Sequence, residues 1–92
     1  MEFEVLAILP RIDVKPNRKG QYEEADVILR YGEIDLHGFT ICRHNDGDCF
    51  VSVPSHRSMT GNWTKTVHCT SQDVFARLKE LILEQYDEEF GE

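Results

Sequence analysis

Short apolar stretches separated by turn residues occupy the first half of the chain and predict a series of β-strands. The run 3–9 is expected to form a first strand, and 25–31 a second strand whose alternate apolar residues share one face. The segment 34–44 predicts a long third strand with a bend at Gly38, because glycine inside a strand often accompanies a kink or bulge. This pattern indicates an antiparallel sheet.

The segment 44–48, His-Asn-Asp-Gly-Asp, is a strong hairpin signal, and the register on either side depends on the loop length. A two-residue turn would place Cys42 opposite Val51 and scatter the apolar side chains over both faces. A three-residue loop with Gly47 in a left-handed conformation pairs Ile41 with Val51 instead. We favour this register because it gathers four apolar residues on one face: Phe39, Ile41, Val51 and Val53.

Beyond this hairpin, Pro54 is expected to end the strand and to release the chain into a loop over 55–62, rich in Ser, Thr and Gly. A further short strand is predicted over 63–67. A helix then follows, with Thr70 or Ser71 as its N-cap. The fold class expected is therefore α+β, with a small antiparallel sheet of four or five strands followed by a C-terminal amphipathic helix.

Apolar residues recur at helical spacing in the last quarter of the chain and predict a stripe that packs on the sheet: Val74, Phe75, Leu78, Leu81, Ile82 and Tyr86. Leu83 lies off this stripe and is expected to be exposed or to face a dimer partner. The acidic segment 87–92 is expected to form a frayed tail.

The length of 92 residues indicates a single domain, 1–92, with a thin core. A homodimer that shares apolar surface would compensate for so small a core. No apolar run approaches the roughly 20 residues of a membrane span, and no secretory signal is visible. We therefore expect a cytoplasmic protein without membrane contact, whose three cysteines are reduced thiols.

Charge is distributed unevenly along a chain whose net charge is -7. Residues 49–72 contain no Asp or Glu. The same segment contains Arg57, Lys65, His56 and Trp63, the only tryptophan of the chain. Such a segment suits an anionic partner better than the rest of the surface does. Trp63 could stack on a base, although a tryptophan beside a glycine turn is more often a core or dimer anchor.

A second basic segment, 11–20, carries three cations besides Arg11 against the single acid Asp13. With its proline, asparagine and glycine it predicts an exposed loop between two strands. We consider two roles for this segment, a mobile solvated loop or a flexible arm that contacts nucleic acid through Lys15, Arg18 and Lys19.

Metal and catalytic sites are not favoured by the sequence. The cluster Cys42-x-His44-x4-Cys49 contains residue types that zinc accepts, but its spacing matches no standard pattern. The register chosen above also places Cys42 and Cys49 on opposite faces of the hairpin. No phosphate-binding loop, nucleophile elbow or spaced carboxylate pair is present. We expect no metal, no cofactor, no catalytic residues and no enzymatic activity.

Several motifs along residues 25–86 together resemble the SpoVG-like septation proteins, the stage V sporulation protein G family: Phe50-Val-x-Val-Pro-Ser-x-Arg57, Gly61-x-Trp63, Val67-His68 and Leu83-x-Gln85-Tyr86. The resemblance implies a homodimeric, non-enzymatic regulator of septation, sporulation and cell division that binds DNA and RNA. Two positions depart from the family pattern. His56 stands in place of a lysine, which removes a permanent charge, and Cys69 in place of a proline.

Two hypotheses follow. In the first, the protein binds DNA or RNA through six residues: Arg57, Lys65, His56, Lys15, Arg18 and Lys19. Arg57 is the main candidate because its guanidinium can contact a phosphate or a guanine edge, although it could instead pair with Asp35 or Glu33. In the second, the net charge of -7 and the histidine at position 56 indicate a protein-interaction module that keeps the fold and has lost nucleic-acid binding.

Overall fold

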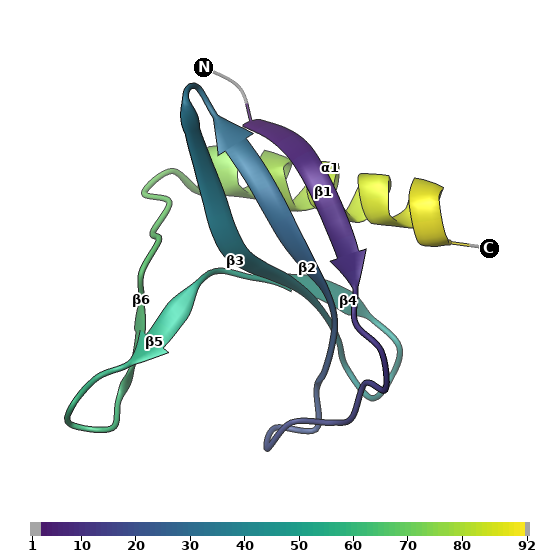
Figure 1. Ribbon diagram of the computed structural model, residues 1–92, viewed down its shortest axis with the longest axis vertical. Coiled ribbons are helices and arrows are strands. Elements are labelled where there is room, and N and C mark those ends of the chain that lie inside the picture. The colour runs from purple at the N-terminus through teal and green to yellow at the C-terminus, as the bar shows by residue number, and fades with distance from the viewer. Residues whose placement is uncertain (1–2, 92) are drawn as a thin grey trace.

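The computed structural model describes residues 3–91, which form two antiparallel sheets and one helix (Figure 1). The main sheet is a meander in the order β1-β2-β3-β4, and β5 and β6 form a separate two-stranded ribbon. The elements are β1 (Phe3–Pro10), β2 (Tyr22–Tyr31), β3 (Ile34–Arg43), β4 (Cys49–Ser52), β5 (Ser55–Arg57), β6 (Trp63–Lys65) and α1 (Gln72–Phe90). The α+β fold predicted from the sequence, an antiparallel sheet followed by a C-terminal helix, is confirmed.

The core lies between one face of the main sheet and helix α1, which crosses that face (Figure 1). Period-two alternation in the strands places one apolar set on this face, and α1 contributes Leu78 and Ile82. Each such side chain stabilises the fold by about 1.5–3 kcal/mol when fully buried. The buried hydrophobic cluster comprises Ile8, Ala25, Val27, Leu29, Phe39, Ile41, Val51, Leu78 and Ile82.

The turn between β3 and β4 is the three-residue loop that the sequence predicted. The His44 N–H donates a hydrogen bond to the Asp48 carbonyl at 2.8 Å, which closes the loop 45–47. Gly47 has φ +101°, and Ile41 pairs with Val51. Ile41 and Val51 are both buried in the core, as this register requires.

Strand β3 bends at Gly38, as expected. Gly38 has φ +97°, and the β2–β3 register shifts beside it, between Val27 and Leu29 on the partner strand. A Cβ atom at Gly38 would lie 3.1 Å from the Cβ atom of the buried Pro54. Pro54 stands where the chain leaves β4 for β5, so the lack of a side chain at Gly38 leaves room for Pro54 at this exit.

The segment 55–62 is only partly the loop that we expected. Ser55–Arg57 form strand β5 and pair with β6, and every residue of the two strands is exposed. Because neither strand of this ribbon packs a face on the core, hydrophobic alternation gives no signal for β5. Strand β6 ends at Lys65, two residues before the predicted end of that strand.

Helix α1 begins after Ser71, whose hydroxyl oxygen accepts a hydrogen bond from the Val74 N–H, so the second of the two predicted caps is correct. The predicted stripe is wrong at its edges. Leu81 and Val74 are exposed, whereas Leu83 packs partly against the core. The sheet therefore covers the side of α1 that carries Leu78, Ile82 and Leu83, and it leaves the side with Val74 and Leu81 exposed.

The acidic end of the chain also differs from the expectation. Helix α1 continues to Phe90, so most of the segment expected to fray is helical, and Glu92 lies outside the described residues. Along residues 3–91, no helix combines the length and the apolar composition that crossing a membrane would require.

Candidate nucleic-acid interface

Two projections extend from the same end of the main sheet, away from helix α1 (Figure 1). One is the hairpin arm, defined here as residues 55–65, which contains β5, β6 and the turn between them. The other is the β1–β2 loop, defined here as residues 12–20, the outer part of the connection between β1 and β2. All six residues predicted to contact nucleic acid lie on these two projections, three on each, and all six are exposed.

The register of the hairpin arm determines which side chains share a face. Arg57 pairs with Trp63, and Ser55 pairs with Lys65, while His56 pairs with Thr64. Since side chains alternate across a strand, Arg57, Trp63 and Lys65 lie on one face and His56 on the other. The structure therefore brings Arg57 and Lys65 together and separates His56 from both.

Trp63 is 72% exposed, so it is not a core anchor of this chain. Its role as a dimer anchor stays a prediction.

The turn of the hairpin arm is held by its own polar groups. The Ser58 N–H donates to the Asn62 carbonyl at 2.8 Å, and the Gly61 N–H donates to the Ser58 carbonyl at 2.9 Å. The Ser58 hydroxyl also contacts the Thr60 hydroxyl at 2.8 Å. These bonds fix the turn at the end of the arm beside Arg57.

Arg57 does not form the ion pairs considered as its structural alternative. Asp35 instead pairs with Arg30 at 2.8 Å, and this hydrogen bond lowers the pKa of the Asp35 carboxyl. No acid among residues 3–91 forms a salt bridge with Arg57 or Lys65. Their charges are therefore available to an external anion.

The β1–β2 loop is organised around Asn17. The Asn17 side-chain oxygen accepts hydrogen bonds from the N–H groups of Lys19 at 2.9 Å and Gln21 at 3.1 Å. In the described part of the chain, the cations of this loop, Lys15, Arg18 and Lys19, form no salt bridge. They extend from an ordered turn into solvent.

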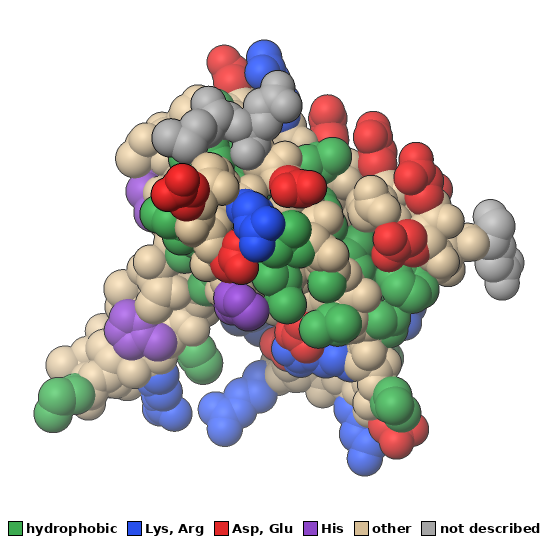
Figure 2. Space-filling model, turned by 45° about the horizontal axis from the view of Figure 1, so that its top comes forward, with side chains coloured by type: hydrophobic (Ala, Val, Ile, Leu, Met, Phe, Trp, Pro, Cys, Tyr) green, Lys and Arg blue, Asp and Glu red, His purple; other side chains and the backbone are tan. Residues whose placement is uncertain are grey.

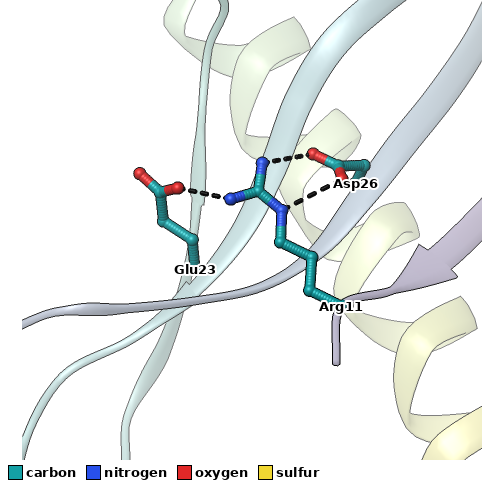
Figure 3. A network of polar contacts seen from close by, with 3 residues as sticks. All are labelled: Arg11, Glu23 and Asp26. Atoms are coloured by element: carbon teal, nitrogen blue, oxygen red, sulfur yellow. Dashed lines mark hydrogen bonds and ion pairs between the residues drawn. The ribbon is translucent and has the colours of Figure 1, made fainter. Parts of the chain in front are cut away.

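Arg11, at the base of this loop, is committed to the fold. Its guanidinium contacts Glu23 and, through two nitrogens at 2.6 and 3.0 Å, the carboxylate of Asp26 (Figure 3). The hydrogen bonds from Arg11 lower the pKa of Asp26 and hold both carboxylates against the sheet. Arg43 is likewise paired with Glu24, whose other oxygen accepts a 3.0 Å hydrogen bond from the Tyr86 hydroxyl.

Charge is thus divided between the projections and the body. Residues 12–20 and 55–65 hold five Lys and Arg residues and one acid, a net +4, so the remainder of the chain carries -11. Figure 2 shows Lys and Arg side chains extending from the lower edge of the molecule and Asp and Glu side chains along its upper right edge. A local positive potential at one end can attract an anion despite the acidic body.

The residues considered for a metal site do not converge. Cys42 pairs with Phe50 and Arg43 with Cys49, so the two cysteines point to opposite faces of the β3–β4 ladder, as predicted. Burial raises the pKa of the Cys42 thiol to about 11 and keeps it protonated at neutral pH. Within 3–91, no group of three His, Cys, Asp or Glu residues is arranged to hold a metal ion.

An apolar groove is a further feature that the sequence did not indicate. It has a volume of about 340 Å³ and lies between the N-terminal half of α1 and the sheet. Phe3, Leu36, Val53 and Phe75 line it, and Val74 stands exposed at its rim. Its formation depends on how the helix crosses the sheet, which the spacing of apolar residues along the chain does not determine.

Comparison with protein-family models, with curated proteins and with solved structures finds no match for this chain. The resemblance to the SpoVG-like family stays a prediction that rests on the motifs quoted above.

Proposed function

We propose that the protein is a small, non-enzymatic, nucleic-acid-binding regulator of the kind that the SpoVG-like resemblance implies. The observation that carries this proposal is that all five Lys and Arg residues of the projections are exposed and pair with none of the described acids. Of the five cations in the body, by contrast, Arg11, Arg30 and Arg43 each contact an acid. Cations left unpaired on exposed arms are those that can replace the counterions of a phosphate backbone.

The proposed mechanism is electrostatic positioning. Arg57 and Lys65 on the hairpin arm contact phosphates of one stretch of backbone, and Lys15, Arg18 and Lys19 on the β1–β2 loop contact another. Phosphate contacts of this kind fix the position of the protein but do not read sequence. Recognition of a preferred target would then come from the few base contacts that the arm can make.

We also propose that the protein acts as a homodimer, which doubles this set of cations. The described fold is open for its size. Its accessible surface is 6977 Å², compared with about 5,500 Å² for a compact monomer of this mass. The apolar groove beside Val74 provides exposed apolar surface of the type that dimers bury.

Sedimentation equilibrium tests the dimer. The wild-type chain should sediment with twice its monomer mass, and Val74→Glu, which places a charge at the rim of the groove, should shift it toward monomer. Val74 is 41% exposed, so the variant should fold. A wild-type protein that is monomeric at 100 μM, or a dimer that Val74→Glu leaves unchanged, would contradict this part of the proposal.

Fluorescence anisotropy with labelled oligonucleotides at low salt tests binding itself. Arg57→Ala should weaken binding, whereas Arg77→Ala on the exposed surface of α1 should not, although both variants lose one positive charge. Arg77 is a matched control because it too forms no salt bridge within the described chain. Equal affinities for the two variants would show that the hairpin arm is not the contact surface.

The acidic body supports a second candidate function, a protein-interaction module with the same fold. Apart from the two projections, the chain carries a net -11, and α1 presents exposed Glu84, Glu88 and Glu89. Such a surface suits a basic protein partner. This candidate predicts that no oligonucleotide binds even at low salt. It also predicts that a basic protein partner can be cross-linked to the wild-type chain, and that the double variant Glu84→Lys and Glu88→Lys loses this cross-link. Retention of that partner by the double variant would contradict it.

A further inference from the structure

Trp63 has surroundings that differ from those of a typical tryptophan. It is 72% exposed, although tryptophan usually buries most of its large apolar surface. It stands on the hairpin arm, within a segment that contains no Asp or Glu from residue 49 to 72. An exposed indole in a segment without acids is accessible to a planar or anionic group.

The neighbours of Trp63 on the face of the arm are polar or cationic. Arg57 is its direct cross-strand partner, Lys65 is the next residue on the same face of β6, and Ser55 is opposite Lys65. Direct cross-strand partners have Cβ atoms about 4.5–5.5 Å apart, so the indole has Arg57 beside it across the ribbon. A face with one large aromatic ring between two cations differs from a protein interface core, where aromatic residues are accompanied by apolar ones.

From this arrangement we propose that the Arg57–Trp63–Lys65 face of the hairpin arm binds single-stranded nucleic acid, with a base stacked on the Trp63 indole and the adjacent phosphates on the two cations. This inference rests on the proposed function and narrows its ligand class. Stacking requires an unpaired base, because the faces of bases within a duplex are already covered by their neighbours. The arm can therefore distinguish single strands from duplexes without reading sequence.

The affinities expected follow from the number of contacts. Two cations on one arm neutralise few phosphates, so their contribution to duplex binding is small at physiological salt. Stacking of one base on an aromatic side chain strengthens binding by about 5- to 150-fold. Single strands should therefore bind more tightly than duplexes of the same length, and the difference should depend on the ring at position 63.

The chain contains a single tryptophan, so its fluorescence reports directly on this contact. We would titrate the full-length protein at low salt with a 10-nucleotide oligo-dT and with a duplex of the same length. The proposal expects the oligo-dT to quench the emission of Trp63 and the duplex to leave it nearly unchanged.

Variants at position 63 provide the second readout, by anisotropy of the labelled oligonucleotides. Trp63→Leu should lower affinity for oligo-dT about 5- to 150-fold while its weaker duplex affinity is retained, and Trp63→Phe should restore most of the loss. Circular dichroism checks that each variant folds, as expected for an exposed position.

The outcomes separate this inference from the proposed function. Binding of oligo-dT with unaltered emission and with equal affinity in Trp63→Leu would overturn the stacking contact and leave nucleic-acid binding intact. Failure of both oligonucleotides to bind would overturn both. Emission that changes with protein concentration, but not with oligonucleotide, would assign Trp63 to an interface between proteins and would also overturn the inference.

Discussion

Gly38→Ala should destabilise the protein more than Gly47→Ala, although the two glycines have similar backbone conformations. Gly38 has φ +97° at the bend of β3, and Gly47 has φ +101° in the β3–β4 turn. Alanine rarely adopts such values, and each substitution should cost about 1–3 kcal/mol through backbone strain alone. If strain were the whole effect, the two variants would lose similar stability.

The surroundings of the two positions differ. An added Cβ atom at Gly38 would lie 3.1 Å from the Cβ and 3.2 Å from the Cγ of Pro54, whereas nothing lies within 4 Å of one at Gly47. Pro54 is buried and its ring is rigid, so it must shift by a few tenths of an ångström. Overpacking of this kind adds about 1–3 kcal/mol, which gives a total of about 2–6 kcal/mol for Gly38→Ala.

Thermal denaturation followed by far-UV circular dichroism measures this difference. Circular dichroism is preferred to fluorescence because the exposed Trp63 is a poor reporter of unfolding. The thermal midpoint of Gly38→Ala should fall below that of Gly47→Ala by about 4–8 °C for each additional kcal/mol. Because Pro54 precedes the hairpin arm, Gly38→Ala should also weaken oligonucleotide binding. Equal losses of stability in the two variants would refute the proposed contact between Gly38 and Pro54.

Three further predictions concern the core, an ion pair and a thiol. Ile82→Ala should lower the free energy of unfolding by about 2–5 kcal/mol because Ile82 is fully buried. Leu81→Ala, at a position 37% exposed, should lower it by less than about 1 kcal/mol. Urea denaturation measures both values. The hydrogen bond from Arg43 lowers the pKa of Glu24 from 4.5, so this pair stabilises the fold above that pH and less as the pH falls through the lowered pKa. Glu24→Gln should therefore lower the free energy of unfolding by roughly 1 kcal/mol at pH 7 and by much less at pH 3. An equal loss of stability at the two pH values would contradict this role of the ion pair. Cys42 is buried and its pKa is raised to about 11, whereas Cys49 is exposed. Iodoacetamide at pH 8 should therefore label Cys42 roughly tenfold more slowly than Cys49, as measured by peptide mass spectrometry. Equal labelling rates would show that Cys42 is accessible.

The main sheet could be predicted from the sequence because its features are local. Alternation placed the strands, Gly38 marked the bend, and the three-residue loop at Gly47 was the register that put Ile41 and Val51 on one face. Where one face of a sheet is buried, the apolar pattern strongly restricts the register. The buried positions of both strands agree with that restriction.

Features that depend on the packing of separate elements could not be predicted. Strand β5 has no apolar pattern because neither of its faces packs on the core. Leu83 packs partly against the core and Leu81 is exposed, the reverse of the prediction, because this depends on how α1 crosses the sheet. The hydrogen bond between Tyr86 and Glu24 joins residues 62 positions apart, which no local signal indicates.

The candidate site was predicted in part. The acid-free segment identified Arg57 and Lys65 from composition alone. Their position on one face with Trp63 depends on the pairing of β5 with β6, and β5 was not predicted. For the same reason, the sequence could not show that His56 points away from them.

The salt dependence of oligonucleotide affinity tests the central claim, that the unpaired cations of the projections bind phosphates. If one single strand contacts about two to four of the ten projection cations of a dimer at a time, the slope of log affinity against log salt concentration should be roughly -1.4 to -2.8. The double variant Arg57→Ala and Lys65→Ala should flatten this slope, whereas Arg77→Ala with Lys79→Ala, which changes the net charge equally, should preserve it. The absence of binding at low salt, or equal slopes in all three proteins, would contradict the account.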